Sequence, residues 1–92
     1  MAQGVALGDI AAHLGAELVG DPAIRIEGIA PLDRAGPSDV AFLAHPRHAK
    51  ELAATGAGAV LVAPAAREAA AARGAALVVD DPYVAYARLT QW

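Results

Sequence analysis

Two apolar runs near the middle of the chain constrain its fold more than any other feature. Neither residues 59–63 (AVLVA) nor residues 76–79 (ALVV) contain a charged or polar side chain. Such runs are typical of strands buried on both faces of a parallel sheet. Between them, Pro64 begins and Gly74 ends an alanine-rich segment that predicts a helix over residues 65–73. A helix between two such strands is the usual connection of a parallel pair. The sequence therefore predicts a β-α-β unit near residues 59–80.

The remaining patterns predict a small α/β domain, with a mixed sheet and helices. Apolar residues at helical spacing predict a first helix that ends near Gly15, and they are Leu7, Ile10, Ala11, Leu14 and Leu18. A short strand is expected over residues 17–19. Residues 24–29 alternate apolar and polar side chains, which indicates a half-buried, antiparallel or edge strand. A loop over residues 31–39, a third strand over 40–43 and a helix over 47–55 complete the pattern.

The last helix is predicted to begin at Pro82, with Asp81 as its N-cap. Tyr83 and Tyr86 lie at helical spacing within it. Tyr86 and Trp92 are large apolar groups near the last residue, so we expect them either to pack against a further segment or to dock on this domain. We accordingly expect the chain to be a piece cut from a longer protein.

Composition and charge exclude several classes of protein. Ninety-two residues fit one domain. A net charge of −3 argues against a protein that binds nucleic-acid backbones. The chain has no cysteine, no signal-peptide pattern and no apolar stretch near the ~20 residues that span a bilayer. We therefore expect a cytoplasmic protein without stable membrane insertion.

The strongest candidate for a binding site lies where the third predicted strand leads into a helix. Phe42, His45 and His48 follow one another at intervals of three residues, and Pro46 separates strand from helix. Flat rings and ring N–H groups in this arrangement can converge on a small planar ligand such as a nucleobase. Arg47, beside the predicted helix start, is a candidate phosphate contact.

Other functional interpretations of these residues have less support. His45 and His48 at a spacing of three can bind a metal, but a third ligand is lacking, and exposed histidines at a helix start are the commoner outcome. The Gly56 and Gly58 segment lacks the third glycine and the following helix of a dinucleotide-binding motif. Ser38 lacks a nucleophile elbow. We expect no metal, no cofactor and no catalytic residue in this chain.

Four ordered blocks resemble a known family. They are residues 28–32 (GIAPL), 35–43 (AGPSDVAFL), 57–62 (AGAVLV) and 80–87 (DDPYVAYA). From about Leu7 to Trp92, the chain resembles the N-terminal domain of the UDP-3-O-acylglucosamine N-acyltransferases of bacterial lipid A biosynthesis. The resemblance implies a single uridine-nucleotide-binding domain over residues 1–92, in which uracil lies between aromatic side chains. Phe42 matches a stacking position, whereas His45 stands where the family usually has Asn and His48 where it usually has Tyr.

The same resemblance implies that acyl transfer occurs elsewhere in the parent protein. In that family, a left-handed β-helix of hexapeptide repeats forms a homotrimer, carries the catalytic His and transfers a 3-hydroxyacyl group from acyl carrier protein to the glucosamine 2-amine. No hexapeptide repeat occurs in these 92 residues. The implied partners are UDP-3-O-acylglucosamine and, through the absent domain, acyl carrier protein. The chain alone is expected to be monomeric and catalytically inactive.

Two alternatives remain open from the sequence. The N-terminal domains of muramyl-peptide ligases are similar small α/β domains that bind uridine nucleotides. Alternatively, the chain is a structural module of a trimeric acyltransferase, in which the two histidine replacements have abolished uridine binding.

Overall fold

A computed structural model describes residues 4–43 and 49–90 of the chain. Its centre is a five-stranded sheet with the strand order β2-β7-β6-β5-β4. The strands are β2 (Glu17–Val19), β4 (Gly28–Ile29), β5 (Asp39–Phe42), β6 (Ala59–Val62) and β7 (Ala75–Val78). Strands β4 to β7 are parallel, and β2 pairs with β7 antiparallel. The predicted mixed sheet is therefore confirmed.

The β-α-β unit is confirmed by the pairing of β6 with β7. Ala59 pairs with Ala75 and Val62 with Val78, in parallel register. The connecting segment begins with a 3₁₀ turn over Pro64–Ala66, and α3 (Arg67–Arg73) follows. The regular α-helix thus begins at residue 67, two residues after the start predicted at residue 65.

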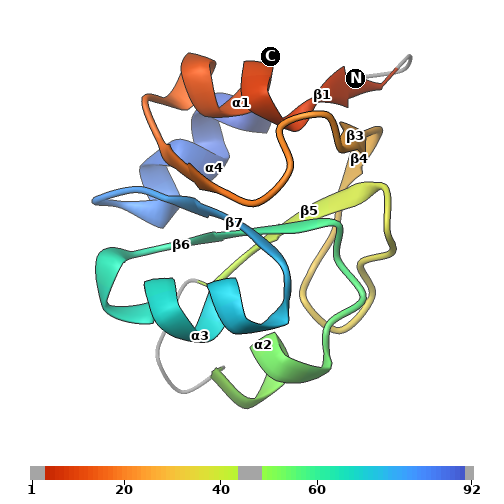
Figure 1. Ribbon diagram of the computed structural model, residues 1–92, viewed down its shortest axis with the longest axis vertical. Helices are drawn as coiled ribbons and strands as arrows, with labels where there is room; N and C mark the ends of the chain where they lie inside the picture. Colours follow the sequence, from red (N-terminus) through yellow and green to blue (C-terminus); the bar gives the residue numbers. More distant parts are fainter. Residues whose placement is uncertain (1–3, 44–48, 91–92) are drawn as a thin grey trace.

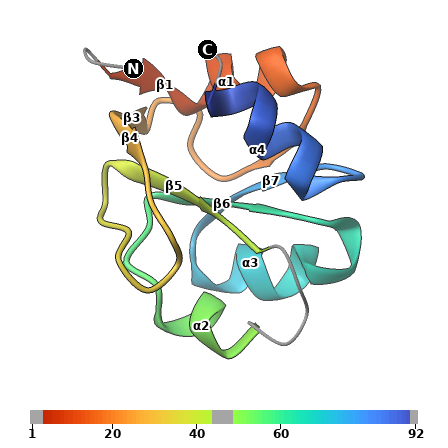
Figure 2. The ribbon, with the colours of Figure 1, turned by 180° about the vertical axis from the view of Figure 1, so that it is seen from behind.

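Helices cover both faces of the sheet, so the molecule has three layers (Figures 1 and 2). The first helix, α1 (Leu7–Leu14), and the last helix, α4 (Pro82–Thr90), lie together on one face. On the other face, α3 lies beside α2 (Ala49–Ala54). The last helix runs back across β6 and β5, and this crossing brings it to the end of β5.

The core consists of two apolar clusters, one between each helical layer and the sheet. Because successive strand residues point to opposite faces, the two clusters draw alternate residues from each strand. Leu61 and Leu77 belong to the cluster under α1 and α4, whereas Val60 and Val78 belong to the cluster under α2 and α3. This explains why the β6 and β7 sequences are apolar throughout rather than alternating.

The first helix ends at Leu14, next to the Gly15 that the sequence predicted as its end. Gly15 adopts a left-handed conformation with φ 65°, and the Ala16 N–H donates to the carbonyl of Ala11 at 2.9 Å. A glycine in this conformation is a common helix C-cap. Leu18 shares the apolar spacing of the helix but lies in β2, where it pairs with Leu77, so the strand predicted over residues 17–19 is confirmed.

The alternating segment over residues 24–29 forms two strands rather than one. Its first half, β3 (Arg25–Ile26), pairs antiparallel with β1 (Val5–Ala6) in a separate two-stranded sheet. Its second half, β4, is the parallel edge strand beside β5. The Glu27 N–H donates to the Ser38 carbonyl at 2.7 Å, at the point where the chain changes its pairing partner. The first half is therefore antiparallel, and the second half is an edge strand, so each half meets one of the two expectations.

The helices of the described ranges are all too short or too polar to cross a membrane. His13, on α1, is exposed.

Candidate functional site

Phe42 is the one predicted site residue within the described ranges, and it lies at the carboxyl end of β5. It pairs with Leu61 in parallel register, and the Leu43 N–H donates to the Leu61 carbonyl at 2.9 Å. Its side chain is half-buried. Ligands of open α/β sheets commonly bind beyond the carboxyl ends of the strands. The sheet therefore fixes the Phe42 backbone at the edge where such folds bind ligands.

Two tyrosines of α4 contact the Phe42 ring. Tyr86 stacks on it, with ring centroids 4.0 Å apart and 30° between the ring planes. Tyr83 meets it edge to face, at 5.6 Å and 72°. The Tyr83 side chain is 65% exposed, whereas Tyr86 is half-buried. One face of Phe42 is therefore covered by Tyr86, and Tyr83 lies beside the ring at the surface.

Asp81 fixes the start of the helix that carries these tyrosines. Its carboxylate Oδ1 accepts the N–H of Tyr83 at 3.0 Å and that of Val84 at 3.3 Å. The predicted N-cap is thus confirmed. Farther along α4, Ala85 and Leu89 are buried in the core cluster that also contacts α1.

We expected Tyr86 either to pack against a further segment or to dock on this domain, and its contact with Phe42 shows the second. Its ring packs against this domain, through Phe42 and the adjoining core cluster. Trp92 lies outside the described residues.

Three predicted site residues, His45, Arg47 and His48, also lie outside the described residues. Their convergence with Phe42 stays a prediction. The neighbouring helix is described from Ala49, two residues after the start that we predicted. Lys50, in its first turn, is exposed.

Sequence reasoning did not connect Phe42 with the two tyrosines. They are 41 and 44 residues apart from Phe42 along the chain, and only the path of α4 across β6 and β5 brings them together. The available signal was the spacing of Tyr83 and Tyr86, one helical turn apart, which places both rings on the same side of a helix. That spacing identifies a common face but not the strand that the face covers.

Two shallow hollows lie at the carboxyl end of β7, and Phe42 lines neither. One, of about 270 Å³, lies between the end of α1 and the start of α4. The other, of about 300 Å³, lies beside the start of α3. Both are lined by Gly15, Val79 and Asp80.

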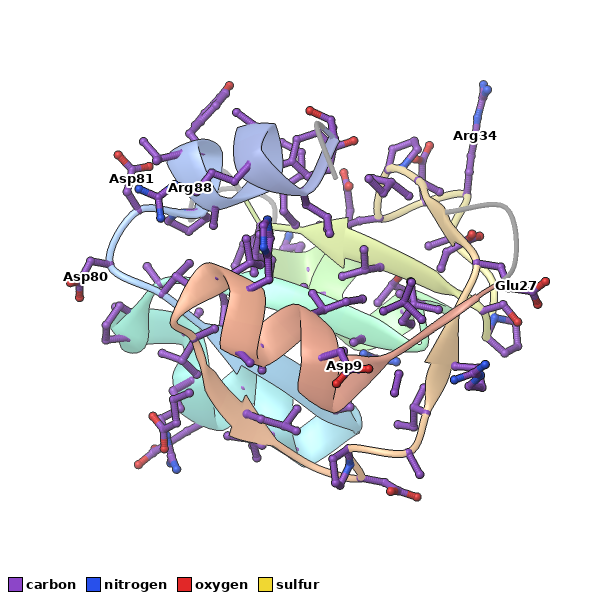
Figure 3. All side chains as sticks on the ribbon, turned by 90° about the horizontal axis from the view of Figure 1, so that it is seen from above. Asp9, Glu27, Arg34, Asp80, Asp81 and Arg88 are labelled. Atoms are coloured by element: carbon purple, nitrogen blue, oxygen red, sulfur yellow. The ribbon has the colours of Figure 1, made fainter. Side chains whose placement is uncertain are left out.

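Acidic side chains border these hollows. In Figure 3, Asp80, Asp81 and Arg88 lie at one end of the molecule, and Glu27 and Arg34 lie toward the opposite end. The carboxylates of Asp80 and Asp81 are on exposed residues and would repel a diphosphate. We therefore do not assign a nucleotide to this corner.

An exposed ion pair crosses one side of the second hollow. Arg67 donates from Nη2 to Glu17 Oε2 at 2.8 Å, and its Nε lies 3.1 Å from both carboxylate oxygens. The hydrogen bond from Arg67 lowers the pKa of the Glu17 carboxyl and correspondingly raises the pKa of Arg67. Since both side chains are about half exposed, the pair joins β2 to α3 with only a small stabilising effect.

In the two described ranges, no group of three or more His, Asp or Glu side chains is arranged to hold a metal ion. The aromatic contacts therefore offer the clearest chemistry in this part of the chain. Aromatic rings at a strand end can stack on a planar ligand.

Comparison with known proteins identifies relatives that are all N-acyltransferases of the same name. Residues 23–92 match the model of a family described as UDP-3-O-(3-hydroxymyristoyl) glucosamine N-acyltransferase, LpxD. The chain is 55% identical over 89 residues to the UDP-3-O-acylglucosamine N-acyltransferase of Delftia acidovorans, with 96% of this chain and 27% of the relative covered. The enzyme of the same name from Albidiferax ferrireducens is 47% identical, with 92% and 26% covered. That of Pseudomonas aeruginosa is 50% identical, with 91% and 23% covered.

The chain thus spans about a quarter of the length of these curated relatives. Their similarity extends over nearly all of it, including the β5 strand that carries Phe42 and the α4 helix that carries the tyrosines.

Proposed function

The chain belongs to the UDP-3-O-acylglucosamine N-acyltransferase family, and we propose that it is the domain with which such an enzyme recognises the uridine of its substrate. The parent enzyme transfers a 3-hydroxyacyl group from acyl carrier protein to the 2-amine of UDP-3-O-acylglucosamine, a step of lipid A biosynthesis. These 92 residues bind part of that substrate and catalyse no reaction by themselves. The membership also decides between the two enzyme families that the sequence left open, in favour of the acyltransferase.

The position of Phe42 is the observation that carries this proposal. Its backbone is held in the parallel ladder at the carboxyl end of β5, its side chain is only half-buried, and Tyr86 covers one ring face. The opposite face is the proposed platform for uracil. Stacking of a base on an aromatic side chain typically contributes about 1–3 kcal/mol, which suits recognition of a free nucleotide by few contacts.

The proposal includes the three predicted contacts that follow Phe42 in the sequence. His48 supplies the second ring, His45 hydrogen-bonds to the edge of the base, and Arg47 contacts a phosphate. A neutral imidazole can stack and can either donate or accept a hydrogen bond, according to its tautomer. If these histidines bind uracil in the neutral form, the affinity falls as the pH drops through about 6.5.

Titration of the 92-residue protein with UMP and with UDP-N-acetylglucosamine, followed by NMR, tests the proposal. Phe42→Leu removes the ring but retains an apolar side chain of similar bulk, so the fold should survive. We expect saturable shifts at Phe42 and its neighbours, and an affinity for UMP about 5- to 150-fold lower in Phe42→Leu. Val84→Ala is the control, because Val84 is half exposed on α4 and lines the hollow away from Phe42.

Either of two outcomes would reject uridine recognition by Phe42. The first is an absence of shifts at millimolar UMP and UDP-N-acetylglucosamine, and the second is an affinity that Phe42→Leu leaves unchanged. Either result would instead favour a structural module of the acyltransferase, without uridine binding at Phe42.

A further inference from the structure

The stack of Tyr86 on Phe42 connects α4 with nucleotide recognition, an inference that rests on the function proposed above. We propose that Tyr86 is a positioning residue. It covers one face of Phe42 and holds the ring in the orientation in which the other face receives the base. Tyr83, in edge-to-face contact, restricts the rotation of the same ring.

Strand pairing fixes the backbone of Phe42 but does not select the orientation of its ring. The parallel pairing with Leu61 and the Leu43 N–H bond fix its backbone. They limit the Phe42 side chain to a few rotamers without selecting one of them. Contacts at the ring itself must therefore select its orientation. Besides the core cluster, the aromatic contacts of Phe42 in the described part of the chain come from Tyr86 and Tyr83.

The two faces of the Phe42 ring differ, because Tyr86 covers one of them. With centroids 4.0 Å apart and planes at 30°, Tyr86 and Phe42 leave no room for a base between them. A base must join on the opposite face, as the outer member of a stack. The edge-to-face contact of Tyr83, at 5.6 Å, restricts rotation of Phe42 toward the surface.

The helix α4 that carries both tyrosines is held at its start and along its buried face. Asp81 caps the helix at two N–H groups, and Leu89 is 1% exposed on the side that faces the core. The tyrosines therefore approach Phe42 from a helix that is anchored at its start and along its buried face. A side chain ordered before binding need not lose its freedom when the ligand arrives.

A purely structural role of the ring cluster makes a different prediction. Phe42 and Tyr86 both pack against the core cluster beneath α1 and α4, so their contact also closes the edge of that core. If closure were the whole role, a leucine at position 86 would serve as well as an aromatic ring for nucleotide binding. If Tyr86 positions Phe42, the aromatic ring is required.

Three variants of the 92-residue protein separate these roles. Tyr86→Leu removes the stacking ring, Tyr86→Phe keeps it without the hydroxyl, and Val84→Ala changes a half-exposed neighbour on α4. Two readouts are needed. The first is the set of Phe42 ring-proton shifts in the free proteins, which report the ring current of residue 86. The second is the affinity for UMP, from the NMR titration of each protein.

We expect Tyr86→Leu to shift the Phe42 ring protons and to lower the UMP affinity about two- to tenfold, equivalent to about 0.4–1.4 kcal/mol. Tyr86→Phe should restore both properties, and Val84→Ala should change neither. The positioning role is overturned if Tyr86→Leu binds UMP as tightly as the wild type, a result that leaves uridine recognition intact. If the wild type itself fails to bind while its Phe42 shifts show the stack, uridine recognition fails, and the positioning role fails with it.

Discussion

Replacing Asp81 by alanine tests how the helix that carries the tyrosines is held at its start. Pro82, the first residue of α4, has no N–H group, so three first-turn donors need acceptors. Tyr83 and Val84 donate to the Asp81 side chain, whereas Ala85 donates to the Asp81 carbonyl at 3.1 Å. Asp81→Ala removes the first two bonds and keeps the third.

The expected loss is about 1 kcal/mol, the usual effect of removing a side-chain N-cap. It should not reach the upper end of the observed range, about 2 kcal/mol, because Tyr83 and Val84 are exposed and water can replace the lost acceptor. Urea denaturation measures it. With a typical slope of about 1–3 kcal/mol per molar for a small domain, the midpoint should fall by about 0.3–1 M.

Asp80→Ala is the matched control for this experiment. Asp80 is the adjacent exposed carboxylate, and no hydrogen bond of its side chain is present among the residues that the structure describes. Asp80→Ala removes the same charge without removing the cap, so we expect the free energy of unfolding to change by no more than about 0.5 kcal/mol. Equal losses for the two variants would mean that charge near the helix start, and not the hydrogen bonds of Asp81, provides the stabilisation.

Three further predictions concern the scaffold. Gly58→Ala should destabilise the fold by about 1–3 kcal/mol in urea denaturation, because a Cβ would overlap the carbonyl oxygen of Pro37; a wild-type midpoint would contradict the close approach. Leu61→Ala, at a fully buried position, should cost about 2–5 kcal/mol, and a loss below 1 kcal/mol would show that Leu61 is not in a packed core. The pair of Glu17 with Arg67 stabilises the fold fully above the usual carboxyl pKa of 4.5 and loses this effect as the pH falls through the lowered folded-state value. Glu17→Gln should therefore unfold slightly earlier in urea than the wild type at neutral pH and together with it in strong acid, and a difference that widened on acidification would refute this.

Local sequence determined most of the architecture because β6 and β7 are unbroken apolar runs. Leu61 and Val62 required burial on opposite faces, and this requirement already implied helices on both sides of the sheet. The cap at Asp81 was equally accessible, because its donors lie two and three residues away.

The features that escaped sequence reasoning depend on contacts between distant segments. The change of strand partner at Glu27 follows from the positions of β1 and β5, not from the alternation of residues 24–29. Likewise, nothing in the local pattern around Phe42 indicates Tyr86, because α4 reaches it only after crossing β6. Periodicity identifies the face of an element that is buried, but tertiary packing selects its neighbour.

In the proposed complex, uracil stacks on the face of Phe42 opposite Tyr86. Intermolecular nuclear Overhauser effects between UMP and the 92-residue protein test it most directly. We predict cross-peaks from the uracil H5 and H6 protons to the Phe42 ring protons, which disappear in Phe42→Leu. Cross-peaks confined to the hollow lined by Asp80 and Arg88, with none to Phe42, would rule out stacking of uracil on Phe42.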